Sequence, residues 1–451
     1  MERVTKVAQT NTDQPVTDAT QTLSQGSDHP KARDCGQIPP AAPQKTYFGL
    51  TKKELSWVLY DVGNSAFVML STALIPVYFS AIAEPGSSVV VAWGYAETVA
   101  SLILALLMPF LGSLADLAGN KKKFLVGFAG TGAVACAALG IPEHALVFLV
   151  IYVVAAIMLN GSMVFYDAFL VDATTEERYD QVSSHGYAWG YIGSCIPFIA
   201  CLVVVLGGSS FGIDTALGMK IAFIITALWW IAFTVPVAKN VRQTHGRPHG
   251  SHVLKTTFAS LMSTMKSIAR DKRLLFFMVA FFFYIDGVHT VIKMSTSYGT
   301  DLGIDSTQLV LALLVTQFVA FPSAIAYGHL AKRFGTRTML MVGVFAYFCI
   351  VLFAAFFLVS ALQFWILAIC VGLFQGGIQA LSRSEYGKLI PKEKANEYYG
   401  FFDIFGKYAA VMGTLLVSVF TQITGNPSWG VLSIAVLFVI GFIFLRMMPQ
   451  K

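Results

Sequence analysis

The residues of this chain whose types and spacing could do chemistry are ionisable side chains inside long apolar segments. The clearest group is Asp286, His289 and Lys293, which follow one another at three and four residues and therefore share one helix face. A charged group in an apolar helix is costly unless it is paired or hydrated, so these residues are candidates for binding or proton transfer. Two interpretations stay open: a substrate or proton site, or a static ion pair.

Two further carboxylates lie within apolar runs. Asp61 is followed by Asn64 and Ser65 at three and four residues, so the three polar side chains share a helix face. Glu97 lies in the next apolar run without an obvious partner nearby. Both carboxylates are candidates for a substrate or proton site. For Asp61 the alternative is a structural charge that ties its helix to a neighbour, or a position near the end of its apolar run.

Paired and neutral polar groups complete the set of candidates. Asp403 and Lys407 are four residues apart, the spacing of an intrahelical salt bridge, and that interpretation is favoured over a site. Gln375 and Gln379 place two amide groups one helical turn apart. Such amides serve equally well as hydrogen bonds between helices or as ligand contacts.

Motifs of enzymes and metal sites are missing from the sequence. It contains no H-E-x-x-H and no phosphate-binding G-x-x-x-x-G-K-[ST]. We therefore expect neither an enzyme nor a cofactor, and no ATP hydrolysis by the chain itself. His245, His249 and His252 lie close together in a basic stretch, but no Cys or carboxylate completes a metal site there, so a solvated loop is expected.

The composition indicates the class of protein that must position these residues. Of 451 residues, 56% are hydrophobic and 12% are charged. Soluble domains carry roughly 25% charged residues, so this chain cannot cover a large water-soluble fold. An integral membrane protein is the class that remains.

Apolar segments of about 20 residues, the length that crosses a bilayer, predict an all-α protein with twelve transmembrane helices. They form two sets of six, separated by a basic segment. The predicted domains are a disordered cytosolic tail (1–46), an N-terminal six-helix bundle (47–238), a cytosolic basic linker (239–273) and a C-terminal six-helix bundle (274–451). The predicted spans are 57–80, 90–114, 124–140, 145–170, 185–207, 218–238, 274–297, 307–330, 338–359, 361–384, 398–423 and 428–447.

The positions of Lys and Arg predict the orientation. Loops assigned to the inside carry most of the basic residues, including eight between Lys239 and Arg273, whereas the loops assigned to the outside contain only Lys220. The positive-inside rule then places both termini in the cytoplasm. The same distribution explains the net charge of +6 without a nucleic-acid partner.

An internal repeat supports two homologous halves. Residues 112–119 (GSLADLAG) end the second predicted span, and a similar segment from Gly328 to Gly335 ends the eighth. The offset is 216 residues, and the same offset carries Asp167 onto Arg383. A duplication of six helices is the architecture of many secondary transporters, with pseudo-symmetric bundles.

The first copy of the repeat has a readable physical role. Gly112 and Gly119 allow close helix approach and a tight turn. Asp116 can pair with a basic group such as Lys121 or cap a neighbouring helix end, and such a contact would hold one conformation. In the second copy Lys332 replaces the acidic residue, so a charge pair on that side is in doubt or reversed in sign.

Two resemblances follow from these motifs. Residues 112–123 resemble the loop 2–3 signature of the major facilitator superfamily. Residues 56–67 (SWVLYDVGNSAF) resemble the opening signature of the Atg22-like (UMF1) permeases within it, and residues 165–170 and 376–384 agree with that family. The resemblance implies a multi-pass permease; the fungal branch is linked with amino-acid efflux from the vacuole. Short loops favour a bacterial plasma-membrane member.

The predicted function is secondary active transport of a small polar solute by alternating access, with amino acids favoured by the resemblance. Proton coupling is a hypothesis that rests on Asp61, Glu97 and Asp286. The expected partners are a small-molecule substrate, membrane lipid and a coupling proton, and nothing requires an oligomer. The alternatives are an exporter of drugs or sugars, or a membrane receptor or scaffold that does not transport.

Overall fold

The structure, a computed structural model, describes residues 46–83, 89–248, 253–301 and 303–449. Apart from Thr46, the predicted tail lies outside these residues. The described part is helical except for its loops and one short antiparallel pair of strands, β1 (Thr46–Tyr47) and β2 (Leu50–Thr51). The all-α fold expected from the sequence is confirmed.

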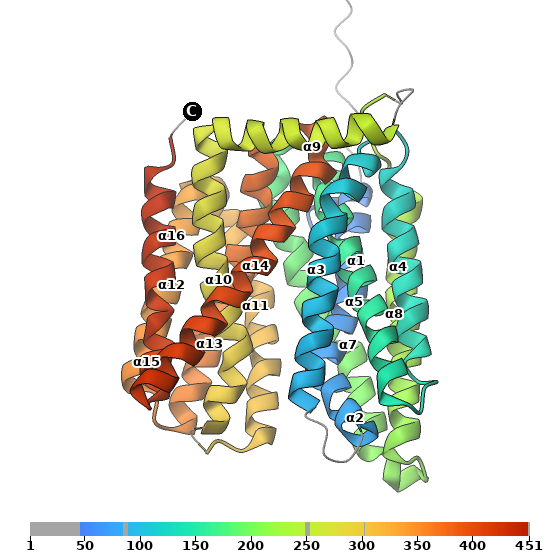
Figure 1. The fold of residues 1–451 in the computed structure, drawn as a ribbon, viewed down its shortest axis with the longest axis vertical. Helices are drawn as coiled ribbons and strands as arrows, with labels where there is room; N and C mark the ends of the chain where they lie inside the picture. Colours follow the sequence, from blue (N-terminus) through green and yellow to red (C-terminus); the bar gives the residue numbers. More distant parts are fainter. Residues whose placement is uncertain (1–45, 84–88, 249–252, 302, 450–451) are drawn as a thin grey trace, which may run out of the picture. The chain divides into compact units, whose positions relative to one another are not determined.

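The helices fall into two sets separated by α9, which lies across one end of the helices (Figure 1). We call this end the α9 face. The first set comprises α1 (Lys52–Ala73), α2 (Ile75–Ile82), α3 (Val89–Ala115), α4 (Lys121–Ala138), α5 (Ala145–Ala168), α6 (Leu170–Ala173), η1 (Glu176–Arg178), α7 (Tyr179–Gly207), η2 (Gly208–Phe211) and α8 (Thr215–Asn240). After α9 (Val253–Arg270) come α10 (Lys272–Asp301), α11 (Ser306–Phe334), α12 (Thr336–Phe357), α13 (Ala361–Leu389), η3 (Lys392–Lys394), α14 (Ala395–Thr424), α15 (Pro427–Ser433) and α16 (Ala435–Met447).

Ten helical segments in the described part are long and apolar enough to cross a membrane. The other two predicted spans are also helical, as α1 with α2 and as α4, but they carry more polar residues. The predicted span 57–80 is interrupted at Leu74, where Pro76 lies at the start of α2. Proline lacks the N–H that a continuous helix requires, which accounts for the break.

Helix α1 begins earlier than predicted. The Thr51 hydroxyl accepts a hydrogen bond from the Glu54 N–H at 3.3 Å, and the Glu54 carboxylate accepts one from the Thr51 N–H at 2.7 Å. This reciprocal capping fixes the helix start at Lys52. Asp61 is therefore nine residues into the helix, about 13 Å along its axis at 1.5 Å per residue, and deeper than the sequence indicated.

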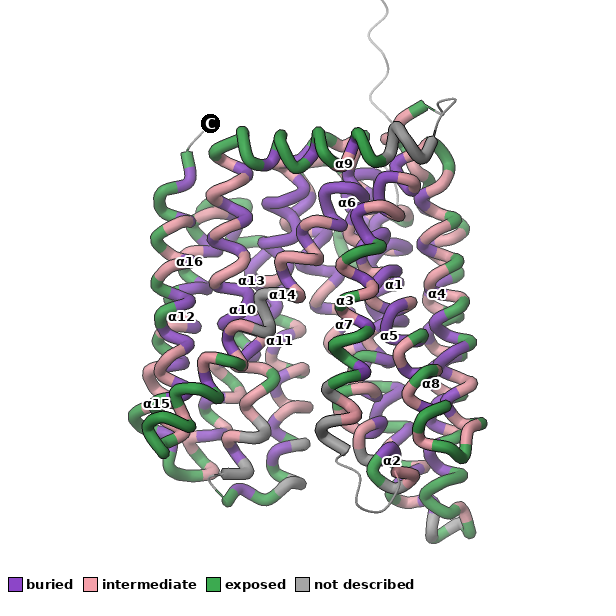
Figure 2. The backbone as a smooth tube through the Cα atoms, viewed as in Figure 1, coloured by how far each residue is buried: buried purple, intermediate pink, exposed green. Residues whose placement is uncertain are grey.

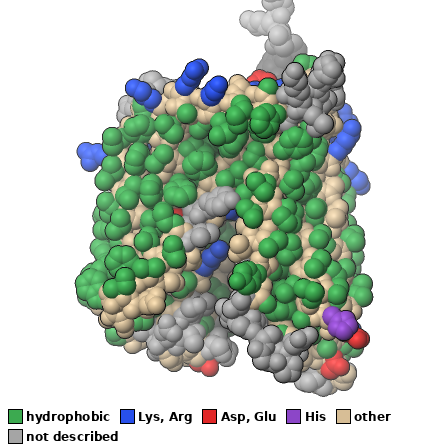
Figure 3. Space-filling view, in the orientation of Figure 1, with side chains coloured by type: hydrophobic (Ala, Val, Ile, Leu, Met, Phe, Trp, Pro, Cys, Tyr) green, Lys and Arg blue, Asp and Glu red, His purple; other side chains and the backbone are tan. Residues whose placement is uncertain are grey.

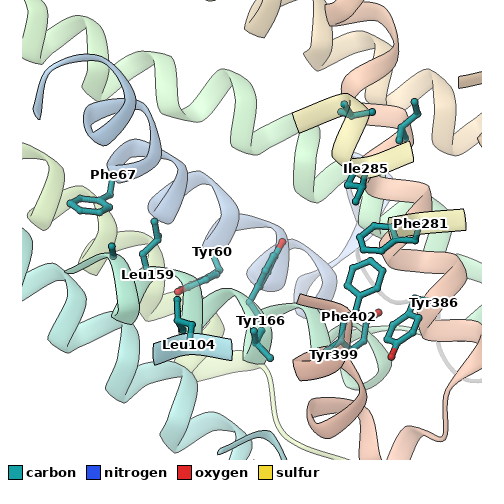
Figure 4. Close-up of a cluster of buried hydrophobic side chains, with 14 of the residues drawn as sticks. Tyr60, Phe67, Leu104, Leu159, Tyr166, Phe281, Ile285, Tyr386, Tyr399 and Phe402 are labelled. Carbon is teal, nitrogen blue, oxygen red and sulfur yellow. The ribbon is translucent and has the colours of Figure 1, made fainter. Parts of the chain in front are cut away.

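Buried residues lie on the inner sides of the helices in both halves (Figure 2), and aromatic rings are prominent among them (Figure 4). In the first half the Trp57 and Tyr166 rings stack with centroids 4.4 Å apart, and in the second half Phe281 and Phe402 stack at 4.0 Å. Large apolar side chains cover the outer surface, as expected for contact with lipid (Figure 3). The buried polar residues therefore lie inside the helical sets rather than on their outer surface.

Candidate functional site

A buried arginine joins the two halves. Arg383 of α13 donates a hydrogen bond to Asp167 of α5 at 2.9 Å, and its guanidinium lies 3.8 Å from the carboxylate of Asp61 on α1. It also donates to the hydroxyl and the carbonyl of Ser183 on α7, both at 2.9 Å. Arg383 is 1% exposed, so these contacts occupy its donors in a dry environment.

Aromatic rings enclose the same guanidinium. Its central carbon lies 4.8 Å, 5.2 Å and 4.4 Å from the ring centroids of Trp57, Tyr166 and Tyr187 respectively. Cation–π contacts of this kind gain strength when water is excluded. The Tyr166 hydroxyl also donates to Asp61 at 3.3 Å. The residues of the 56–67 and 165–170 motifs thus meet around Arg383.

A second contact layer lies nearer the α9 face, where Asp116 caps the start of α14. Its carboxylate accepts hydrogen bonds from the backbone N–H groups of Asn396 and Glu397, both at 2.9 Å, and from the Asn396 side-chain amide at 2.8 Å. Free N–H groups and the positive end of the helix dipole make a helix start a binding site for an anion. This is the helix-capping contact that the sequence suggested for Asp116.

A third layer is formed by Asp180 at the start of α7. Its carboxylate accepts hydrogen bonds from Lys388 and Thr336 at 2.7 Å and from Ser384 at 2.5 Å, all in the second half. In both layers the acid comes from the first half. In the second copy, where Lys332 stands in place of the acid, the acid of the contact is Asp180 of the first half.

The repeated glycines allow these layers to close. A Cβ atom on Gly112 would lie 2.5 Å from the carbonyl oxygen of Asn396, and one on Gly328 would lie 2.8 Å from Cβ of Ser184. Gly119 and Gly335 have φ values of +82° and +87°, the left-handed region that glycine adopts at little cost. Close approach and tight turns, the roles expected from the sequence, are both present.

Lys121 is buried within the first half. Its ammonium lies 2.7 Å from the Asp172 carboxylate, which also accepts hydrogen bonds from the N–H groups of Thr244 and His245. Burial alone would raise the pKa of Asp172, but the Lys121 ammonium and these hydrogen bonds outweigh it and hold that pKa below its usual range. Lys121 and Asp172 thus fix the segment after α8. His245 lies in a loop and is partly exposed, as expected, but the loop is held against Asp172. His249 and His252 lie outside the described residues.

Burial raises the pKa of Asp116 to about 6, although the Lys121 ammonium and the donors on α14 act in the opposite direction. If the halves separate, Asp116 meets water and its pKa returns towards the ordinary value near 3.9. The closed contact therefore binds a proton more tightly, and its stability decreases as the pH rises through about 6.

We expect the distance between spin labels at Lys123→Cys and Lys332→Cys, exposed positions on opposite halves, to shorten when the pH falls from 7.5 to 5. Pulsed electron resonance in a cysteine-free background measures this distance. Asp116→Asn, which cannot ionise, should remove the pH dependence. An identical pH profile in the variant would mean that another group causes it.

The candidates on α10 lie in a different environment. The Asp286 side chain is buried and one oxygen accepts hydrogen bonds from the Gly413 N–H at 2.9 Å and from the Thr290 hydroxyl at 3.3 Å. Its other oxygen has no hydrogen-bond partner among the described residues. Asp286 forms no ion pair with Lys293 in the described part of the chain. The structure therefore does not contain the static ion pair that was the alternative interpretation.

The remaining α10 candidates lie near α14. The Lys293 side chain is exposed, and the ammonium groups of Lys293 and Lys407 both act electrostatically on the His289 ring. Asp403 and Lys407 form the intrahelical ion pair expected from their spacing. Figure 3 shows a hollow between the two halves, away from the α9 face, with basic side chains in it.

The four remaining candidates make few contacts. Glu97 on α3 accepts a hydrogen bond from the Tyr152 hydroxyl on α5, the partner that the sequence did not reveal. Gln379 donates to the Tyr191 hydroxyl of the other half at 3.3 Å, whereas Gln375 is buried. Asn64 donates to the Tyr60 carbonyl at 3.0 Å and lies 3.5 Å from the Asp61 carboxylate.

Sequence reasoning missed the residues that connect the linker to the α14 start. Arg247 donates to the Ser113 hydroxyl and to the Ser260 hydroxyl, both at 2.7 Å, and Ser260 donates to Glu397 at 2.8 Å. Glu397 is buried, and its backbone N–H, in the first turn of α14, donates a hydrogen bond to Asp116. Ordinary polar residues in a polar linker carry no pattern that would single them out.

Two six-helix halves, in contact at one end and separated by a hollow towards the other, define a transporter of the major facilitator type. The fold is shared with the crystal structure of the superfamily transporter FucP in the outward conformation, at a TM-score of 0.67 and 15% identity over 88% of this chain and 99% of that one. A bacterial homologue of the iron transporter ferroportin, in an outward-facing state, matches at a TM-score of 0.63 and 14% identity over 89% and 99% of the two chains.

The sequence comparisons identify the family. The profile of the family described as "Vacuole effluxer Atg22 like" matches residues 87–451, and the chain belongs to this family. The MFS-type transporter YxiO of Bacillus subtilis (strain 168) is 47% identical over 410 residues, which cover 89% of this chain and 96% of that protein. The protein is thus a multi-pass membrane transporter and not an enzyme.

A more distant relative is autophagy-related protein 22 of Botryotinia fuckeliana, 24% identical over 304 residues. The match covers 61% of this chain and 51% of that protein, so the chain spans about half the length of this fungal relative.

Proposed function

We propose that this transporter carries a small polar solute, with amino acids as the favoured class, by alternating access coupled to protons. The observation that supports this most is the asymmetry of the described structure. Three contact layers join the halves on the α9 side, around Arg383, Asp116 and Asp180, and a hollow separates the halves on the other side (Figure 3). In an alternating-access cycle, separation of these layers opens the solute site to the α9 face.

The charges on α10 and α14 suit a zwitterion. Lys293 and Lys407 can attract a carboxylate, while the unpartnered oxygen of Asp286 can accept a hydrogen bond from an ammonium group. Amino acids carry both groups. The resemblance to the Atg22-like permeases, whose fungal branch is linked with amino-acid efflux from the vacuole, favours the same class.

Proton coupling is assigned to the buried carboxylates. Asp61 and Asp167 share the single positive charge of Arg383, so the cluster has a net charge of −1 when both are ionised. One proton neutralises it and weakens the attraction that joins the halves. Glu97 is a further candidate, since its helix α3 packs against α14 of the other half. Asp286 is another, because one of its buried oxygens has no hydrogen-bond partner among the described residues.

The α9 face is assigned to the cytoplasm, in a plasma membrane. The loops rich in Lys and Arg gather on it, and the positive-inside rule places such loops inside the cell. The chain end at α16 lies on the same face (Figure 1). With this assignment, the hollow away from the α9 face receives its solute from outside the cell, and the reverse step completes a cycle that can run in either direction.

We expect amino acids to raise the thermal stability of the purified transporter in detergent, because a ligand that binds only the folded state adds RT ln(1 + [L]/Kd), about 2.7 kcal/mol at one hundred times Kd. Lys293→Ala should reduce this shift by removing a charge that attracts the carboxylate. Lys123→Ala, a matched loss of an exposed lysine on α4, should leave the shift unchanged. Differential scanning fluorimetry measures both.

The same panel includes sugars, dipeptides, nucleosides and cationic drugs. A shift confined to sugars or drugs would contradict the amino-acid assignment and support an exporter of those compounds. If no compound shifts the stability and proteoliposomes take up none of them, the receptor or scaffold alternative would be favoured instead.

A further inference from the structure

Helix α9 has an unusual distribution of polar and apolar side chains. Ser260, Thr264 and Ile268, spaced four residues apart, are buried against the rest of the chain. In contrast, Phe258, Met262 and Met265 form another stripe and are 64%, 42% and 50% exposed. We call these three residues the apolar stripe of α9. Contact with an apolar partner would stabilise these side chains, and the described residues do not provide one.

The charges of α9 indicate what that partner is. The helix contains no Asp or Glu, and Lys266 and Arg270 are exposed on one flank of the apolar stripe. Lys272 and Arg273 follow directly. Figure 3 shows basic side chains along the rim at this end, with hydrophobic side chains below them that continue into the lipid-facing surface. Helices with this pattern lie in the membrane interface, where basic residues meet anionic headgroups.

The buried side of α9 is attached to the contact layer at the α14 start. The Ser260 hydroxyl donates to Glu397 of α14 at 2.8 Å and accepts from Arg247 at 2.7 Å. Arg247 in turn donates to the carbonyl and the hydroxyl of Ser113 on α3, at 2.8 Å and 2.7 Å. The position of α9 is therefore linked directly to whether α3 and α14 are joined.

From these observations we infer that α9 binds the anionic lipid surface of the membrane, and that this binding stabilises the state in which the halves are joined at the α9 face. Lipid headgroups hold Lys266 and Arg270, and the acyl region takes up the apolar stripe. The docked helix then keeps Ser260 and Arg247 in contact with α14 and α3. The regulatory part rests on the proposed alternating access, whereas the lipid contact does not depend on any substrate.

The lipid contact is tested by spin labels on neighbouring residues in a cysteine-free full-length chain, in nanodiscs of phosphatidylglycerol. A label at Met262→Cys should be reached several-fold more by oxygen, which partitions into lipid, than by a water-soluble nickel chelate. A label at the exposed Ser263→Cys, on the polar side, should show the opposite preference. If the nickel chelate reaches both labels equally, or if neither collider reaches Met262 because protein covers it, the inference is wrong.

The regulatory part is tested by the distance between labels at Lys123→Cys and Lys332→Cys. In phosphatidylglycerol we expect a larger fraction of the short distance than in phosphatidylcholine. Removing the charges by Lys266→Gln and Arg270→Gln should reduce this preference about fivefold per charge. Met262→Glu should reduce it too, whereas Ser263→Glu, which adds the same charge on the other side, should reduce it less.

Equal distance distributions in the two lipids would overturn the regulatory inference. The lipid contact is judged separately by the collision experiment, and the proposed solute by the stability panel. A failure of one is therefore distinguishable from a failure of the others. Size-exclusion chromatography with light scattering identifies the case in which a second copy covers α9.

Discussion

Replacing Arg383 by alanine is expected to cause the largest loss of stability of any single change in this chain. The substitution leaves the carboxylates of Asp61 and Asp167 buried without their shared positive charge, and it empties the space between three aromatic rings. Removing one partner of a buried ion pair costs about 3–5 kcal/mol, because an uncompensated charge remains in a dry site. The free energy of unfolding, measured in mild detergent with increasing SDS, should fall by that amount.

Two further variants separate charge from packing. Arg333→Ala removes an exposed arginine of α11 and should change the stability little. In Arg383→Ala the additional change Asp167→Asn removes one stranded charge and should restore part of the loss. If the double variant is no more stable than the single one, the cost of Arg383→Ala comes from lost packing.

Gly112→Ala is expected to shift the conformational equilibrium most strongly. Its added Cβ would lie 2.5 Å from the Asn396 carbonyl oxygen, a backbone atom of the other half that cannot rotate away. Overpacking of this kind costs about 1–3 kcal/mol, which corresponds to a change in the ratio of two states of roughly fivefold to more than a hundredfold. The labels at Lys123→Cys and Lys332→Cys should report a larger fraction of the long distance.

The chain offers a matched control and a symmetric test. Gly127→Ala makes the same change on α4, where an added Cβ meets no atom within 4 Å, and it should leave the distance distribution unchanged. Gly328→Ala should act like Gly112→Ala, because its Cβ meets Ser184 of the other half at 2.8 Å. An unchanged distribution in both glycine variants would show that these contacts do not hold the halves together.

Much of the architecture was predictable because the determining signals are local. Apolar length and loop charge indicate the helices and their two sets of six, and the 216-residue repeat indicates the duplication. The pairing of Asp403 with Lys407 followed from helical spacing alone. Gly112, Gly119 and Asp116 also have the roles that their chemistry suggested.

The tertiary contacts could not be predicted in the same way. Whether Asp180 is solvated depends on α12 and α13, which lie more than 150 residues away in the sequence. The partners of Asp286 are a backbone N–H of α14 and a hydroxyl of its own helix, and no spacing rule selects the former over Lys293. The linker was expected only as a basic segment, whereas its residues 253–270 form the helix α9.

The contact between Asp167 and Arg383 has a consequence for whether the two halves could replace one another. The two residues occupy equivalent places in the two repeats, 216 positions apart, and yet they bind each other at 2.9 Å. Two residues at equivalent positions of a pseudo-symmetric pair can touch only beside the symmetry axis that relates the two repeats. An exchange of one half for a second copy of the other would place two aspartates or two arginines there, in a site from which water is excluded, and they would repel each other. The two halves are therefore complementary at this position and cannot replace one another.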